Sequence, residues 1–173
     1  PVPGMDLAGT VEAVGAAVTR FRPGDEVFGS GTGAFAEYAA ASQAKLARKP
    51  SNISWEQAAA IGNSSAAALK ALRDVAQVQP GQHVLVIGAS GGVGSFAVQI
   101  ATAWGAEVTG VASTSKVELV RSLGAVDVID YTREEIMDRD VRYDVILDIA
   151  GNRSLSTLRR ALAPEGTLGI VGG

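Results

Sequence analysis

Residues 88–94 read Gly-Ala-Ser-Gly-Gly-Val-Gly and constrain the fold more than any other segment of the chain. They follow an apolar run, 83–87, and lead into residues 93–104, whose apolar positions line one face of a helix. A glycine-rich turn in this context is typical of a dinucleotide-binding loop. Backbone without side chains can approach a pyrophosphate closely, and the helix start offers free N–H groups. The alternative is a strand-to-helix turn that holds no ligand.

Within this loop the glycines have different expected roles. Gly91 and Gly92 would allow the close approach of the pyrophosphate, and Gly94 would let the helix pack on the preceding strand. The first glycine of the usual GxGxxG pattern is replaced by Ala89. Ser90 and Val93 complete the segment that we expect to contact a cofactor.

Strands and helices alternate from residue 83 onward. We predict strands at residues 83–87, 107–112, 127–131, 143–149 and 167–171, and helices at 93–104, 116–123 and 154–162. Apolar strands separated by helices indicate a parallel sheet that is covered on both faces. The pattern therefore predicts an α/β fold with a doubly wound parallel sheet of the Rossmann type.

The front of the chain has a different pattern, in which short apolar segments alternate with glycines and turns. Residues 23–25, Pro-Gly-Asp, predict a turn into a strand at 26–28, and residues 35–41 predict a strand of mostly small residues. Such irregular short strands indicate a piece of a β-barrel or β-sandwich. Residues 50–52, Pro-Ser-Asn, mark the end of this region, so we predict domains at residues 1–53 and 54–173.

A helix is expected directly after that boundary. Ser54 and Gln57 have the spacing of a capping box, which predicts a helix start. The alanine-rich segment that follows predicts a helix to about residue 75, with a break near Gly62.

The end of the second predicted strand, 107–112, bears on which dinucleotide the loop would bind. NAD enzymes usually place Asp or Glu there to bind the ribose 2′-hydroxyl. Here Ser113, Thr114 and Lys116 follow the strand, and hydroxyls with a cation suit a 2′-phosphate. We therefore predict NADP(H) as the cofactor. An alternative, compatible with this role, is that Ser113 caps the next helix and Lys116 is merely solvated.

Composition excludes several other functions. The chain has no cysteine and a single histidine, His83, so it offers neither a thiolate site nor a set of metal ligands. The net charge of −3 is spread without a basic block, which argues against a nucleic-acid partner. No apolar run reaches membrane-spanning length and no signal peptide opens the chain. We therefore predict a cytoplasmic protein that acts on a small molecule.

These motifs resemble the medium-chain dehydrogenase/reductase superfamily, and within it the quinone oxidoreductase (zeta-crystallin-like) group. From Gly81 the chain reads GQHVLVIGASGGVGSFAVQIAT, which departs from the group's signature at Thr102. It follows that signature at Leu85, Ala89, Ser90, Gly91, Gly92, Gly94 and Gln99. Near the front, the superfamily's N-terminal motif is matched by Gly4, Gly9, Gly15, Val18 and the turn Gly24-Asp25-Glu26-Val27. The resemblance covers nearly the whole chain.

The resemblance implies two domains. One is a GroES-like β-barrel that here lacks its first strands, and the other is a Rossmann domain that here lacks its last unit. Both ends of the chain also look cut, because it opens within a motif and closes on an apolar segment. We therefore expect an internal fragment of a longer protein, and we expect these 173 residues alone to be inactive.

Zinc is not expected. Zinc-dependent relatives carry Gly-His-Glu where this chain has Gly4-Met5-Asp6, and their zinc also needs a cysteine. Met5 cannot replace an imidazole as a zinc ligand, and we read it as a core side chain. The chain is therefore similar to the zinc-free members of the superfamily.

The resemblance implies further cofactor contacts. Tyr131 matches a tyrosine beside the adenosine 2′-phosphate, although a strand-end aromatic that covers the sheet edge is an alternative. Ala150 and Gly151 match the segment that passes the nicotinamide ribose, where Asp148 could instead bind loop amides. Val171-Gly172-Gly173 matches the backbone beside the carboxamide. The predicted cofactor-binding residues are Ser90, Gly91, Gly92, Val93, Gly94, Ser113, Thr114, Lys116, Tyr131, Ala150, Gly151, Val171 and Gly172.

Without a metal, a carbonyl must be polarised by hydrogen bonds, which favours substrates that are already activated. We therefore expect NADPH-dependent hydride transfer to a quinone or an α,β-unsaturated carbonyl compound, by a protein that is a homodimer at full length. Alternatives are a zinc-free alcohol or carbonyl reductase, an enoyl reductase module of a synthase, and a non-catalytic NADPH-binding or interaction protein. No catalytic residue is assigned, since Tyr38 and His83 are candidates by residue type only. Ala67 stands where the family often has a threonine near the nicotinamide, so that contact is lost or moved to Asn63 or Ser64.

Overall fold

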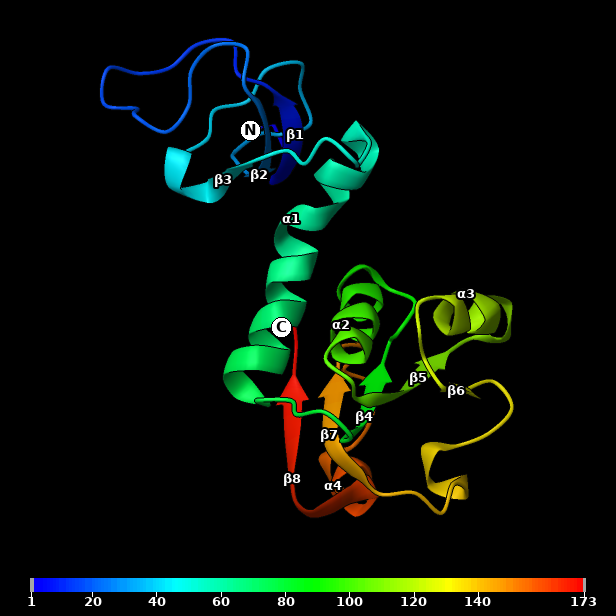
Figure 1. Cartoon of the computed structure of the whole chain (residues 1–173). Coiled ribbons are helices and arrows are strands. Elements are labelled where there is room, and N and C mark those ends of the chain that lie inside the picture. Colours follow the sequence, from blue (N-terminus) through cyan, green and yellow to red (C-terminus); the bar gives the residue numbers. More distant parts are fainter. Residues whose placement is uncertain (1, 173) are drawn as a thin grey trace. The chain divides into compact units, whose positions relative to one another are not determined.

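The chain forms two compact units in the computed structural model, which describes residues 2–172 (Figure 1). The units are Pro1–Ala66 and Ala67–Gly173, and their division falls within helix α1 (Trp55–Lys70). The boundary predicted from the sequence, between residues 53 and 54, lies just before α1. Gly173, to which we assigned a backbone contact with the carboxamide, is outside the described residues.

The first unit contains a three-stranded antiparallel sheet in the order β1-β2-β3. Its strands are β1 (Asp6–Thr10), β2 (Glu26–Ser30) and β3 (Leu46–Arg48), and a short 3-10 turn, η1 (Gln43–Lys45), precedes β3. The predicted turn before β2 is present, with Gly24 at a φ of +91°. It is held by Asp25, whose carboxylate accepts hydrogen bonds from the Arg48 guanidinium at 2.8 and 3.0 Å.

Two predictions for this unit are wrong. Residues 35–41 do not form a strand, because no neighbouring strand pairs with them, and the backbone there makes one isolated bridge, between Thr32 and Ala40. Phe35 and Tyr38 are consequently exposed. Met5, which we expected in a core, is 63% exposed because it precedes β1 at the surface.

Helix α1 begins as predicted, and the helical segment ends near residue 75 as predicted. The main-chain N–H of Ser54 donates to the Gln57 side chain at 2.9 Å, and the main-chain N–H of Gln57 donates to the Ser54 hydroxyl at 3.2 Å. These two hydrogen bonds confirm the capping box. The break expected near Gly62 does not occur. The helix passes through Gly62 and is followed by a π-helical turn, η2 (Ala71–Val75).

The second unit is built on a five-stranded parallel sheet in the order β6-β5-β4-β7-β8. The strands are β4 (His83–Ile87), β5 (Glu107–Ala112), β6 (Asp127–Asp130), β7 (Tyr143–Asp148) and β8 (Leu162–Ile170). From β4 the chain adds strands in one direction and then returns to add β7 on the other side. This order confirms the doubly wound Rossmann topology.

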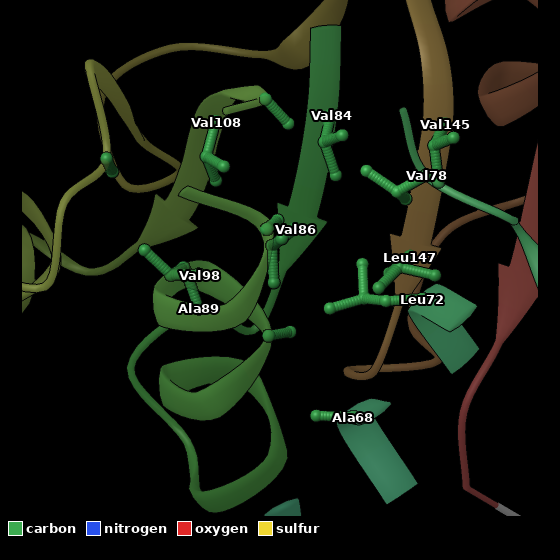
Figure 2. Packing of buried hydrophobic residues seen from close by; sticks show 14 of the residues in the cluster. Ala68, Leu72, Val78, Val84, Val86, Ala89, Val98, Val108, Val145 and Leu147 are labelled. Atoms are coloured by element: carbon green, nitrogen blue, oxygen red, sulfur yellow. The ribbon is translucent and has the colours of Figure 1, made fainter. Parts of the chain in front are cut away.

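Helices cover both faces of the sheet. On one face, α2 (Gly92–Ala103) and α3 (Val117–Ser122) pack with the end of α1 in a core of small and branched residues. Figure 2 shows Leu72 beside Leu147 of β7 in that core. On the other face, α4 (Leu155–Ala161) buries Leu158 against residues that include Leu85 and Ile146. Within residues 2–172, no helix is long and apolar enough to cross a membrane.

The last helix and strand differ in detail from the prediction. Ser154 is the N-cap of α4 rather than its first residue, and the helix ends at Ala161, with β8 directly after it. The strand runs through Pro164, which is tolerated because β8 is at the edge of the described sheet and one side needs no hydrogen-bond donor. Its pairing with β7 shifts register between Tyr143 and Val145.

Candidate cofactor-binding site

The predicted site residues come together at one edge of the five-stranded sheet. All five strands are parallel, so their carboxyl ends, at Ile87, Ala112, Asp130, Asp148 and Ile170, share that edge. In Figure 1 the arrows of β4, β7 and β8 point the same way. The thirteen residues named from the sequence follow these strand ends on five successive loops.

Main-chain hydrogen bonds fix the loops to the sheet. The Ala89 amide donates to the Val111 carbonyl at 3.1 Å, and the Tyr131 amide donates to the Ala112 carbonyl at 3.2 Å. On the other side of β4, the Ile149 amide donates to the Ile87 carbonyl at 3.1 Å and the Val171 amide to the Asp148 carbonyl at 3.0 Å. Each loop therefore leaves its strand along a path that the neighbouring strand determines.

The glycine loop makes its tight turn at Gly88, where φ is +85°. Ala89 replaces a glycine of the usual pattern without strain, since it does not have a positive φ, and it is fully buried. Room for Ala89 comes from Gly110 on β5, because a Cβ there would lie 3.0 Å from the Ala89 Cβ. The sequence analysis did not identify Gly110, although a glycine inside an apolar strand often marks such a close approach.

The later glycines of the loop have different surroundings. A Cβ at Gly94 would overlap the Gly88 carbonyl oxygen, so close packing of α2 on the loop requires glycine there, as predicted. A Cβ at Gly91 would meet that oxygen alone, at an ordinary 3.4 Å. Gly91 and Gly92 are exposed at the start of α2, where Gly91 is the N-cap residue.

The loop after β5 carries the residues on which the choice of cofactor depends. Thr114 and Lys116 are exposed in a 3-10 turn, η3 (Thr114–Lys116). Ser113 is the N-cap residue of this turn, in line with the alternative that it caps the next helix. Its hydroxyl makes no cap hydrogen bond and lies 3.5 Å from the Ser115 hydroxyl.

A carboxylate that the sequence analysis did not assign to the site lies beside this loop. Asp130, the last residue of β6, is 8% exposed and pairs in register with Ala112. Its Oδ2 accepts from the Thr114 hydroxyl at 2.5 Å, and its Oδ1 accepts from the Thr132 hydroxyl at 2.7 Å. The hydrogen bond from Thr114, then those from Thr132, hold the pKa of Asp130 below its usual range, and Arg133 adds a smaller attraction.

A carboxylate at the end of the predicted strand 127–131 is visible in the sequence. Its position beside the loop after β5 follows only when the register between β5 and β6 is known. Residues 128–131, Val-Ile-Asp-Tyr, were interpreted through the aromatic residue alone. Tyr131 itself is 52% exposed just beyond β6.

The loops after β7 and β8 present mainly backbone. Asp148 is 3% exposed, and its Oδ1 accepts from the Gly151 amide at 2.9 Å, which confirms the alternative that it binds a loop amide. Ala150 and Gly151 are exposed beyond it, with Gly151 at a φ of +65°. Val171 packs against the α2-side core, and Gly172 has a φ of +108°.

The other candidate residues named from the sequence lie outside the five loops. His83 is the first residue of β4, at the opposite end from the glycine loop, and its Nδ1 lies 3.4 Å from the Glu107 carboxylate. Tyr38, Asn63 and Ser64 belong to the first unit. In that unit the main-chain N–H of Asn63 donates to the Asp6 carboxylate at 2.8 Å. Among residues 2–172, no group of three or more His, Cys, Asp or Glu side chains could hold a metal ion.

Two family models match the chain. Residues 1–51 match the alcohol dehydrogenase GroES-like domain, and residues 92–173 match the zinc-binding dehydrogenase family.

Among curated proteins, the chain is 42% identical over 162 residues to the chloroplastic NADPH-dependent alkenal/one oxidoreductase of Arabidopsis thaliana, an alignment that covers 87% of the chain and 42% of the relative. It is 38% identical over 179 residues to human quinone oxidoreductase, covering 98% of the chain and 54% of that protein. The chain thus spans about half the length of the curated relatives it matches.

Among solved structures, the quinone oxidoreductase from Coxiella burnetii superposes with a TM-score of 0.89 at 30% sequence identity. The match covers 95% of this chain and 54% of that one.

Proposed function

Because this chain belongs to the medium-chain dehydrogenase/reductase superfamily, in its quinone oxidoreductase group, we propose that the whole protein transfers hydride from NADPH to a quinone or an α,β-unsaturated carbonyl compound. The observation that carries the proposal is the glycine loop, 88–94, at the carboxyl edge of the sheet beside the point where the strand order reverses. Dinucleotides bind at such switch points in open α/β sheets.

The shape of the loop supports a diphosphate beside Gly91. Glycine at this position is not required by packing within the protein, since a Cβ would meet only one atom at an ordinary distance. A ligand that approaches the main chain explains the residue better than the fold does. The amides at the start of α2 are then available to bind the two phosphates, with the positive end of the helix dipole behind them.

The surroundings of the loop after β5 support NADPH over NADH. Ser113 and Lys116 supply a hydroxyl and a cation after β5, and β5 itself ends in alanine rather than a carboxylate. The exposed Tyr131 follows the neighbouring strand, and its main-chain amide donates to the Ala112 carbonyl. A phosphate monoester is recognised by this combination of cation and hydroxyl groups. The Arabidopsis relative is named as NADPH-dependent, which agrees with the assignment.

The loops after β7 and β8 would position the nicotinamide end. Asp148 fixes the turn at Gly151 through the Gly151 amide, so the backbone of residues 150–151 keeps one path past the cofactor. When bound, NADPH supplies a hydride to an electron-poor carbon of the substrate, and a proton from solvent completes the reduction. We propose that no zinc takes part, and that the protein mainly holds the two reactants in contact.

Cofactor titration of this chain and turnover by the whole protein test the proposal. We expect NADPH to bind more tightly than NADH, and the whole protein to oxidise NADPH when p-benzoquinone or an alkenal is added. The variant Lys116→Gln should weaken NADPH binding and leave NADH binding unchanged, whereas Lys70→Gln, an exposed lysine on α1, should change neither. Tighter binding of NADH would contradict the cofactor assignment. No binding of either cofactor would contradict the function.

A further inference from the structure

The hydrogen-bond network around Asp130 determines which groups the β5 loop can offer to a ligand. Three contacts connect the Asp130 carboxylate and the hydroxyls of Thr114 and Thr132: two from hydroxyl to carboxylate, at 2.5 and 2.7 Å, and one between the hydroxyls, at 2.9 Å. The Thr132 amide also donates to Asp130, at 3.0 Å. An ionised carboxylate is acceptor-only, and each hydroxyl has one hydrogen to donate.

Counting these hydrogens fixes the direction of the network. The hydroxyls of Thr114 and Thr132 have two hydrogens for three contacts. Both hydroxyls lie against the Asp130 carboxylate, which is the strongest acceptor, so both hydrogens point to it. The Thr114 hydroxyl, although it belongs to an exposed residue, therefore has no hydrogen left for a ligand and presents only lone pairs. A phosphate needs donors, whereas a ribose hydroxyl can donate to a lone pair.

We propose that Asp130 is a specificity-determining residue, which limits the preference for NADPH over NADH by holding the Thr114 hydroxyl as an acceptor at the end of β5. The inference rests on the proposed function and revises one expectation from the sequence: Thr114 does not bind the 2′-phosphate. Instead it accepts from the ribose 2′-hydroxyl of NADH. The negative charge of Asp130 acts in the same direction, because it opposes a phosphate brought to this loop.

The donors that do bind the 2′-phosphate are outside this network. Ser113 and Ser115 contact one another at 3.5 Å and not Asp130, and Lys116 is exposed. Arg133, whose charge is felt by Asp130, follows the same strand end. NADPH binding thus depends on Ser113 and Lys116, while Asp130 and Thr114 determine how well NADH competes.

The test compares two substitutions at opposite ends of β6. In Asp130→Asn, the amide keeps an oxygen for Thr132 and presents an N–H group to Thr114, so the Thr114 hydrogen becomes free to donate to a phosphate. We expect the ratio of the Kd for NADH to the Kd for NADPH, measured by titration of the full chain, to rise about tenfold. The control, Asp127→Asn, removes a carboxylate that binds Arg139 at 3.0 Å at the other end of the strand, and should leave the ratio unchanged.

A second variant keeps the inference testable if Asp130→Asn does not fold, which thermal melting would reveal. In Thr114→Val, the ribose 2′-hydroxyl of NADH loses its hydrogen-bond acceptor, whereas NADPH loses no contact, so the ratio of the Kd for NADH to the Kd for NADPH should rise. Thr114→Ser keeps the hydroxyl and should have the wild-type ratio. If Thr114 were a phosphate donor, the ratio would fall in Thr114→Val, and this result would overturn the inference.

The outcomes separate the inference from the proposed function. If the substitutions only loosen the loop, binding of NADPH and NADH should weaken equally, and the ratio of their Kd values should stay at the wild-type value. That result would overturn the role of Asp130, while the proposed function would stand. If neither cofactor binds the wild-type chain, both are wrong.

Discussion

Gly91 and Gly94 stand three positions apart in one loop, and the structure gives them opposite reasons for being glycine. At Gly94 a side chain would collide with the Gly88 carbonyl inside the protein, whereas at Gly91 it would make only an ordinary contact with that oxygen, at 3.4 Å. The first constraint concerns folding, whereas the second follows from the proposed cofactor, so the two can be separated by substitution.

We expect Gly94→Ala to destabilise the fold by about 1–3 kcal/mol, the usual cost of forcing extra atoms into a packed position. Gly91→Ala should leave the melting temperature unchanged and weaken NADPH binding about tenfold or more, since its methyl group occupies the space of the diphosphate. Thermal melting and cofactor titration of both variants measure these effects. Equal loss of stability in the two would contradict the division of roles.

Asp25 makes a second prediction at the residue scale. The Arg48 guanidinium, and then the Arg22 amide, hold the pKa of this carboxyl below its usual range. A carboxyl whose pKa is lowered on folding stabilises the protein above its unfolded pKa, about 3.9, and this contribution is lost as the pH falls through the folded pKa. Asp25→Asn should therefore be less stable than the wild type at neutral pH and equally stable in strong acid.

Denaturant unfolding over a range of pH measures the difference. Asp74→Asn is the matched control, because Asp74 also has a lowered pKa but its main partner is the adjacent Arg73, at 2.6 Å. Neighbours in sequence remain close in the unfolded chain, so their attraction adds little to the free energy of unfolding. A stability difference for Asp25→Asn that persisted unchanged into strong acid would show that the effect is not due to the charge.

Single residues were predictable where a short motif carries the constraint. The need for glycine at position 94 and the bond from the Gly151 amide to Asp148 follow from local pattern and are present in the structure. The contact between Thr114 and Asp130 joins residues 16 apart through the register of β5 and β6, which the sequence does not display. The exposure of Met5 was missed for a similar reason, since the residue type favours a core that this position does not reach.

The secondary-structure elements agree with those predicted wherever a long segment has regularly spaced apolar residues. The five strands of the parallel sheet are all present, with ends that differ by a few residues from those predicted. The strand predicted at residues 35–41 is absent because a strand needs a partner, and small residues with two aromatics do not identify one. Helix α1 continues through Gly62, although glycine has a low helix propensity, and the Asp6 carboxylate and Gly29 carbonyl lie where a side chain would be.

Gly62 provides the prediction at this scale. Replacing a helical glycine by alanine usually stabilises a helix by about 0.5–1 kcal/mol. Here a Cβ would overlap the Asp6 carboxylate and lie 3.1 Å from the Gly29 carbonyl oxygen, so we expect Gly62→Ala to lower the free energy of unfolding. Ala66→Gly, at an exposed position of the same helix, should cost about 1 kcal/mol by propensity alone. Stabilisation by Gly62→Ala in denaturant unfolding would contradict the packing argument.

On the scale of the whole molecule, the chain combines two units that differ in what they contribute. The second unit contains all the loops of the proposed cofactor site, and the first contains the antiparallel sheet. The doubly wound order was predictable because apolar strands alternating with helices permit few arrangements. The exact division within α1 was not, since a continuous helix shows no boundary in its sequence.

We expect the 173-residue chain to bind NADPH but not to reduce a quinone. The cofactor loops lie within one unit, but the chain spans about half of the length of relatives such as human quinone oxidoreductase, at 54%. Cofactor titration alongside a steady-state assay with NADPH and p-benzoquinone measures both properties. Robust turnover by the isolated chain would show that this length is sufficient for activity.

The main-chain bonds that tie each loop to the neighbouring strand also bear on how such a site can evolve. The bonds from Ala89, Tyr131, Ile149 and Val171 involve no side-chain atoms, so this part of the frame does not depend on which side chains the loops carry, whereas the turn at Gly151 also needs the Asp148 carboxylate. Mutation can therefore exchange the groups that read a ligand while the loops keep their paths. A lineage built on this edge can acquire new cofactor or substrate preferences by single substitutions, without passing through unfolded intermediates.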